Sequence, residues 1–232
     1  TPIKSSAASD VYKRQAAGLT RQNWKSAVLI VLAFVGIYIV RTVVSVAVQG
    51  VSDGSGMQYV KEWAAMFKNP MMWLNIAALP INYFFVFIAF FGEEYGWRYY
   101  LQPVLQKRFG LRAGVIILGV VWGLWHIPDD LFYYTQTSGI QMIFAQQITC
   151  ISLGIFFAYA YMKTQNIWVP VCLHYLNNNL IPIISGTFSA DVLENQTVSW
   201  KDLPVALVLN GLCFGFFLLA DVFKKKEVQE EE

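Results

Sequence analysis

Six apolar segments, each near the length that a helix needs to cross a lipid bilayer, constrain the fold of this chain more than any other feature. They cover residues 26–48, 71–92, 112–127, 140–162, 167–185 and 204–223. A helix spans the hydrocarbon core with about 20 mostly apolar residues. Apolar residues make up 56% of the chain and charged residues 14%, which is unusual for a soluble domain. The sequence therefore predicts an all-α, polytopic transmembrane bundle of about six spans.

The fifth of these segments is short and is interrupted by Pro170 and Pro182 and by a run of three asparagines. Polar and proline-broken backbone is tolerated at membrane depth only where other helices or a water-filled cavity surround it. We therefore expect residues 167–185 to be surrounded either by other helices or by a water-filled cavity.

No internal repeat or low-complexity linker divides residues 16–223, which predicts a single transmembrane domain. Residues 1–15 (TPIKSSAASDVYKRQ) are polar, lack a signal-peptide pattern and resemble a translated sequencing adapter. We predict that they are a non-native or disordered leader and that the native chain begins upstream. Residues 224–232 are predicted to be a charged cytosolic tail.

The distribution of lysine and arginine predicts the orientation, because cytosolic loops are enriched in these residues. One side of the predicted topology carries Lys13, Arg14, Arg21, Lys25, Lys107, Arg108, Arg112, Lys163, Lys224, Lys225 and Lys226. The other side carries Lys61, Lys68 and Lys201 with the acids Asp129, Asp130, Asp191, Glu194 and Asp202. We expect both termini in the cytosol. No basic tract indicates nucleic acid as a partner.

Ionisable side chains inside predicted spans are costly and each requires an explanation. In the segment FFGEEYGWRYYL, Glu94 and Arg98 are four residues apart and are predicted to pair on one helix face. Glu93 points about 100° away and has no cation within its own turn. This makes Glu93 the candidate general base, and an interfacial salt-bridge cluster is the alternative interpretation.

Both histidines of the chain fall in predicted spans. His126 follows Trp122 by one helical turn, and the stretch from Glu93 to His126 is nearly symmetric about the Phe109–Gly110 turn. Residues equally far from the turn of an antiparallel hairpin lie at similar depth, so we expect Glu93 and His126 within reach of each other. Pro103 is the feature that would break the first arm and spoil this match.

His174 and Asn178 are four residues apart and share a helix face, with Asn177 as a second candidate. Such pairs also serve simply to hold helices together. The three cysteines lie in apolar runs without a CxxC pair and are expected to be buried thiols. Cys172 faces away from His174, which argues against a Cys–His nucleophile. HExxH, a phosphate-binding loop and GxSxG do not occur in the sequence.

In order, the motifs are Glu93-Glu94-xxx-Arg98, Trp122-xxx-His126 and His174-xxx-Asn178. This trio resembles the CPBP family of intramembrane proteases, often called metalloproteases, over residues 70–182. The family includes the type II CAAX prenyl endopeptidases and bacterial bacteriocin-immunity (Abi-like) proteins, which implies a multi-pass protein of a bacterial plasma membrane. Trp122 departs from the pattern, where phenylalanine is more common.

The resemblance implies a role for each motif residue. Glu93 with His126 would activate a water, and His174 with Asn178 would stabilise the oxyanion. Glu94 and Arg98 would hold the local helix geometry. Glu93, His126 and His174 would supply three ligands if Zn²⁺ is used, with a fourth position open for water. A metal-free glutamate mechanism remains equally open.

Two functions stay in competition at this point. The first is an intramembrane endopeptidase acting on a membrane-bound or hydrophobic peptide, and the second is a non-catalytic immunity or adaptor protein that binds a peptide in the same polar cavity. The complete polar set favours the enzyme, because a binder does not need Glu93 together with both histidines. A transporter fragment is disfavoured because no paired half-repeat is visible.

Overall fold

The computed structural model describes residues 18–19, 22–54, 56–186 and 190–224, and these contain helices and no strand. The helices are α2 (Trp24–Asp53), α3 (Gly56–Met66), α4 (Pro70–Glu94), a π-helix η1 (Tyr95–Leu101), α5 (Gln102–Phe109), α6 (Leu111–Trp125), α7 (Ile127–Phe132), α8 (Gly139–Thr164), α9 (Trp168–Ser185), α10 (Ala190–Glu194), α11 (Asp202–Cys213) and the 3₁₀ turns η2 (Gly215–Leu219) and η3 (Asp221–Phe223). The predicted leader 1–15, and the predicted tail apart from Lys224, lie outside the described residues.

The all-α polytopic architecture predicted from the sequence is confirmed, with a difference in the number of spans. Within the described part of the chain, four helical stretches are long and apolar enough to cross a membrane: 24–48, 70–109, 111–132 and 139–164. The last two predicted spans are helical but do not qualify. The polar residues 177–179 lower the hydropathy of α9, and α11 has only 12 residues before the chain turns into η2 and η3.

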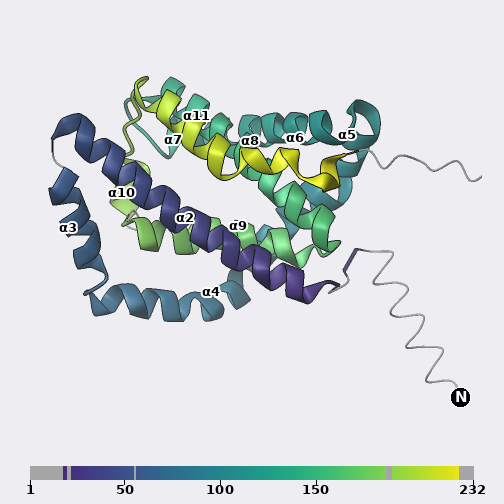
Figure 1. Cartoon of the computed structure of the whole chain (residues 1–232), viewed down its shortest axis with the longest axis horizontal. Coiled ribbons are helices and arrows are strands. Elements are labelled where there is room, and N and C mark those ends of the chain that lie inside the picture. The colour runs from purple at the N-terminus through teal and green to yellow at the C-terminus, as the bar shows by residue number, and fades with distance from the viewer. Residues whose placement is uncertain (1–17, 20–21, 55, 187–189, 225–232) are drawn as a thin grey trace, which may run out of the picture.

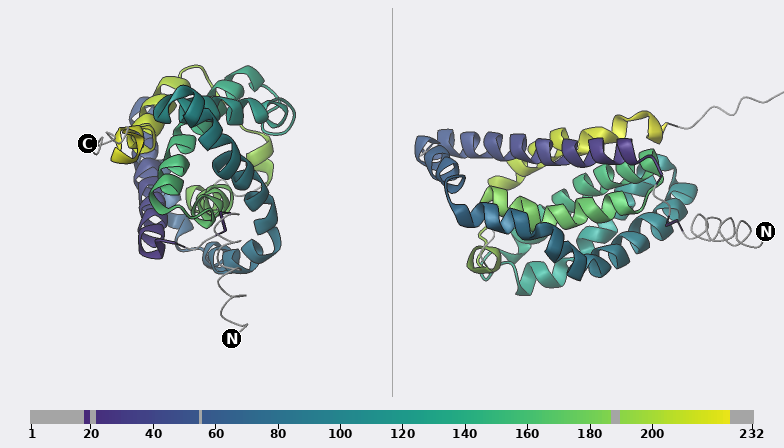
Figure 2. Two further views of the ribbon diagram at one scale, coloured as in Figure 1. Left: turned by 90° about the vertical axis from the view of Figure 1, so that its right-hand side faces the viewer. Right: turned by 90° about the horizontal axis from the view of Figure 1, so that it is seen from below.

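The helix α9 is enclosed, as its polar residues and prolines require. It packs against α2, α4 and α8, and the end-on view shows it in the middle of the bundle (Figure 2, left). Residues along most of its length are buried, from Val169 to Ile184. Side chains on this helix can therefore meet partners from several elements that are distant in sequence.

The stretch from α4 to α6 forms the predicted helical hairpin. Pro103 lies where α5 continues from the π-helix, and the helical stretch 70–109 runs through it without interruption, so it does not break the first arm. The chain reverses at Gly110, whose φ of 90° suits glycine. Ring contact between Trp97 and Trp125 (6.3 Å between centroids) joins the two arms.

Between α4 and α5 the backbone forms the π-helix η1, a rare conformation that is frequent at functional sites.

The helices α6 and α8 approach closely at Gly119. A Cβ atom added to Gly119 would lie 2.6 Å from the Cα of Ile151, and backbone atoms cannot easily move away. Gly119 and Gly123 form a GxxxG pair, a spacing that lets helices pack tightly in membranes.

We expect Gly119→Ala to lower the midpoint of thermal unfolding by several degrees, because overpacking costs about 1–3 kcal/mol. Gly36→Ala is the matched control, since a Cβ there meets nothing within 4 Å and alanine is the better helix former. The midpoints are measured in detergent. Equal midpoints for the two variants would contradict the close α6–α8 contact.

The basic segments predicted to share one side lie together at one end of the bundle. The Asn23 side chain donates to the carbonyl of Thr164, and Asn166 donates to the carbonyl of Gln22, so the start of α2 meets the end of α8. In Figure 1 the start of α2 and α5 lie at one end, while α3, α7 and α10 lie at the other. Lys25 and Lys163 are therefore at the end opposite to Lys61.

Candidate active site

A buried ion-pair network connects the first and third motifs. Arg98 Nε donates to Glu94 Oε2, and His174 Nδ1 donates to Glu94 Oε1, each at 2.9 Å. Glu94 and Arg98 are fully buried and His174 is 3% exposed. Glu94 is the last residue of α4 and Arg98 lies in the π-helix, so the local pair follows from the predicted i, i+4 spacing. The bond to His174 fixes α9 against this segment.

Aromatic rings line this network and exclude water from it. The Arg98 guanidinium lies over Trp122 (5.2 Å) and Phe157 (5.4 Å). The His174 ring contacts Trp122 at 5.4 Å and Phe90 at 5.2 Å between centroids. Trp122, the aromatic residue of the second motif, therefore contacts both Arg98 and His174. Among the described residues, the two terminal nitrogens of Arg98 are buried and have no hydrogen-bond partner.

The two histidines differ in what their Nδ1 atoms meet. His126 Nδ1 lies 2.8 Å from the backbone carbonyl of Trp122. A carbonyl oxygen only accepts, so His126 Nδ1 donates to it, and in the neutral ring the lone pair is then on Nε2. His174 Nδ1 instead donates to the carboxylate of Glu94. The two rings are therefore held by different partners, a backbone carbonyl and a carboxylate.

Glu93 lies beside this network without joining it. Its side chain is half-buried, and no hydrogen bond or ion pair engages its carboxylate within the described residues. It does not hydrogen-bond to His126. Both residues are close to Cys150: the Cys150 Sγ lies 3.8 Å from His126 Nδ1, and Glu93 is within electrostatic range of the thiol. Glu93 and His126 therefore both lie near the Cys150 side chain on α8.

The asparagines of the third motif have distinct surroundings. Asn178 is exposed, and its Oδ1 accepts a hydrogen bond from Asn177 Nδ2 at 2.9 Å. Asn179 donates to the backbone carbonyl of Tyr175 and accepts from Asn82, so it serves to join α9 to α4. Asn178 does not contact the Glu94 network directly.

Two side chains near the site were not identified from the sequence. Asp130 was expected in an outer loop, but it is fully buried in α7, and both of its carboxylate oxygens lack a partner among the described residues. Cys150 is buried, as expected of the thiols, and it lies within electrostatic range of Asp130 and Arg98. Neither residue belongs to a sequence motif. Only the packing of α7 against α8 brings them near the site, and this packing could not be read from the sequence. Cys172 and Cys213 are half-buried free thiols.

The arrangement of these donors does not fit the zinc site that the resemblance implies. Among the described residues, no three His, Cys, Asp or Glu side chains are close enough to hold one metal ion. Glu93, His126 and His174 are thus not gathered in the tetrahedral geometry that zinc requires.

Comparison with known proteins supports the motif assignment. Residues 73–180 match the family model of type II CAAX prenyl endopeptidase Rce1-like proteins. The chain is 27% identical over 125 residues to the CAAX prenyl protease 2 of Methanococcus maripaludis. This match covers 50% of the chain and 45% of the relative, so the chain spans about half the length of the curated protein it matches. No solved structure matches the chain.

The matched segment contains all three motifs, from Glu93 to Asn178. It also contains Glu94, Arg98 and His174, which form the buried network. Over residues 73–180, the chain is similar to the Rce1-like family of type II CAAX prenyl endopeptidases.

Proposed function

We propose that this protein is an intramembrane endopeptidase that hydrolyses peptide bonds in membrane-associated or hydrophobic substrates. The observation that carries the proposal is the pair of adjacent acids: Glu94 is fully engaged with Arg98 and His174, whereas Glu93 has no partner within the described residues. An unpaired carboxylate beside a fixed polar network is what a general base requires. The match to a CAAX prenyl protease supports the same reaction class.

The proposed chemistry uses one water and no covalent intermediate. Glu93 takes a proton from the water, with His126 Nε2 as a second acceptor, and the hydroxide oxygen bonds to the scissile carbonyl carbon. The negative charge on the carbonyl oxygen is stabilised by His174 and the Asn178 amide. The C–N bond then breaks, and the proton held by Glu93 passes to the leaving amine. Glu94 and Arg98 orient His174 and do not exchange protons.

Cleavage of a reporter peptide by purified protein in lipid vesicles tests this function. Vesicles with the wild-type chain should release the product, and vesicles with the Glu93→Gln variant should not. Tight peptide binding without cleavage by the wild-type chain would instead favour a non-catalytic immunity or adaptor protein.

We expect the activity to survive complete removal of metal ions. The candidate ligands Glu93, His126 and His174 are not gathered around one point within the described residues, so Glu93 would activate water directly. Elemental analysis after chelation shows that the protein is free of metal. Peptide cleavage by this protein is then compared with and without added Zn²⁺. Loss of activity on chelation with recovery on zinc addition would establish the metalloprotease mechanism in its place.

We propose further that both termini face the cytosol of a bacterial cell, because the start of α2, the end of α5 and the end of α8, which carry basic residues, lie at one end of the bundle. A membrane-impermeant maleimide should label Lys201→Cys but not Arg108→Cys in intact cells, and both residues are exposed. The unsubstituted chain, with its three native cysteines, is the background control. Labelling of Arg108→Cys alone would reverse the orientation.

A further inference from the structure

A short chain of hydrogen bonds connects the first helix to the exposed asparagine of the third motif. The Tyr38 hydroxyl on α2 donates to Asn177 Oδ1 at 2.5 Å. Asn177 Nδ2 in turn donates to Asn178 Oδ1 at 2.9 Å. Tyr38 belongs to none of the motifs and lies outside residues 73–180, which match the family.

These two hydrogen bonds determine which end of the Asn178 amide faces outward. A side-chain amide has one accepting oxygen and one donating NH₂ group. The Tyr38 hydroxyl has no other acceptor among the described residues, so it donates to Asn177 Oδ1, and the NH₂ group of Asn177 faces Asn178. The Asn178 oxygen is therefore turned toward Asn177, and its NH₂ group points away. Flipping the Asn178 amide would bring two NH₂ groups together and lose the bond.

The outward NH₂ group of Asn178 is free to act on a ligand. No protein acceptor takes it within the described part of the chain, and Asn178 is exposed. Asn177, in contrast, uses both ends of its amide inside the protein. This separates the two asparagines that sequence spacing left as alternatives.

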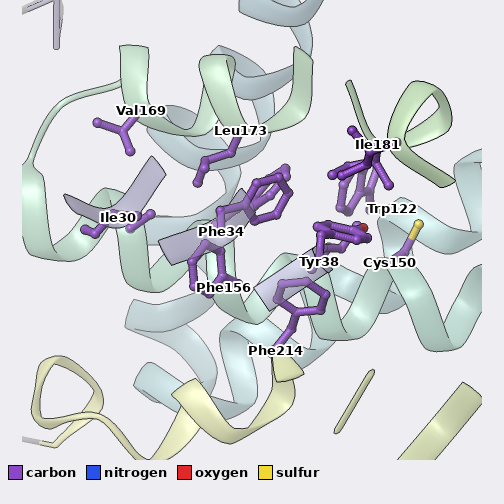
Figure 3. Close-up of a cluster of buried hydrophobic side chains, with 14 of the residues drawn as sticks. Ile30, Phe34, Tyr38, Trp122, Cys150, Phe156, Val169, Leu173, Ile181 and Phe214 are labelled. Atoms are coloured by element: carbon purple, nitrogen blue, oxygen red, sulfur yellow. The ribbon is translucent and has the colours of Figure 1, made fainter. Parts of the chain in front are cut away.

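Tyr38 itself is held firmly in place. Its ring is 5% exposed and contacts Phe34 at 5.0 Å and Phe214 at 5.1 Å between centroids. The guanidinium of Arg41 lies 5.8 Å from the ring centroid. Figure 3 shows Tyr38 inside the buried cluster, near Phe34, Phe214 and Trp122. The packing of this ring thus fixes the position of the hydroxyl.

We propose that Tyr38 is a positioning residue for hydrolysis: through Asn177 it holds the Asn178 amide with its NH₂ group directed at the oxyanion. This inference rests on the function proposed above. It predicts that part of the oxyanion site is set by α2, a helix outside the matched domain. Loss of the Tyr38 hydroxyl should therefore act on the chemical step and only through Asn178.

The test is a double-mutant cycle measured on peptide cleavage. Asn178→Ala should lower kcat by about 10²–10³-fold, the usual loss of an oxyanion donor. Tyr38→Phe keeps the ring and should lower kcat by roughly tenfold with little change in KM, because a misplaced group weakens catalysis. In the Asn178→Ala background, Tyr38→Phe should have no further effect.

Tyr175→Phe is the matched control. Its hydroxyl is a comparable buried group on α9, and it donates to the carbonyl of Leu79 at 2.7 Å without touching Asn178. Any effect of Tyr175→Phe on kcat should be the same with and without Asn178→Ala. Asn177→Leu removes the middle member of the hydrogen-bond chain. It should reproduce the Tyr38→Phe result and replaces that test if the Tyr38→Phe variant folds poorly.

The outcomes separate this inference from the proposed function. If Tyr38→Phe lowers kcat by the same factor in both backgrounds, or not at all, the positioning role is wrong. If Glu93→Gln cleaves normally, the proposed general base is wrong, and the coupling between Tyr38 and Asn178 still decides the present inference.

Discussion

Replacing Glu93 by glutamine should lower kcat for peptide cleavage by about 10²–10⁴-fold, the loss expected when a general base is removed. Glutamine keeps the shape of the side chain but cannot take up the proton of the attacking water. The variant should remain folded, because the half-buried Glu93 carboxylate makes no hydrogen bond or ion pair with the described residues. Cleavage is compared at equal amounts of folded protein.

Two other acids show whether the effect is specific to Glu93. Glu62→Gln removes an exposed carboxylate on α3 and should leave kcat unchanged. Glu94→Gln should reduce the stability and keep partial activity, because it weakens the link between Arg98 and His174. A folded but inactive Glu94→Gln variant beside a fully active Glu93→Gln variant would reverse the two roles.

Replacing Arg98 by methionine should lower the free energy of unfolding by about 3–5 kcal/mol. The change leaves the fully buried Glu94 carboxylate without its cation, and breaking a buried pair from one side is costly. The double variant Glu94→Gln/Arg98→Met should recover part of this loss, because no buried charge is then left unpaired. Thermal or denaturant unfolding in detergent measures the three free energies.

Lys107→Met is the matched control for the loss of a cation. Lys107 is exposed on α5, nine positions beyond Arg98 in the sequence, and its removal should change the free energy of unfolding by less than about 0.5 kcal/mol. An Arg98→Met protein as stable as the Lys107→Met protein would show that the Glu94–Arg98 pair does not contribute to the fold.

Local spacing was enough to predict the parts of the site that lie within one helix. The Glu94–Arg98 pair follows from an i, i+4 separation, and the bend at Gly110 follows from the symmetry of the hairpin about that residue. The apolar segments likewise predicted the positions of the main helices to within a few residues. In each case the determining forces act between residues close in sequence.

Contacts between distant helices could not be predicted in this way. His174 bonds to Glu94 across 80 positions, and Tyr38 bonds to Asn177 across 139. Both depend on how α9 is rotated among its neighbours, which tertiary packing decides. The burial of Asp130 has the same origin. The early end of α11 at Cys213 also differs from the prediction, since hydropathy alone does not distinguish an α-helix from the 3₁₀ turns that follow.

The π-helix at Tyr95–Leu101 carries a consequence for how the chain tolerates changes in length. A π-type turn holds more residues than an α-helical one, so everything after it is rotated by roughly one residue, or ~100°, compared with an unbroken α-helix. That rotation brings Gln102 into the interior and lets Gln106 reach the carbonyl of Leu111. Deleting a single residue between 95 and 101 would restore regular α-helix and leave both glutamines on their present face, because the deletion removes the extra residue that the π-type turn accommodates. This segment should therefore tolerate the loss of one residue, a change that would rotate everything after it by ~100° elsewhere in the helix.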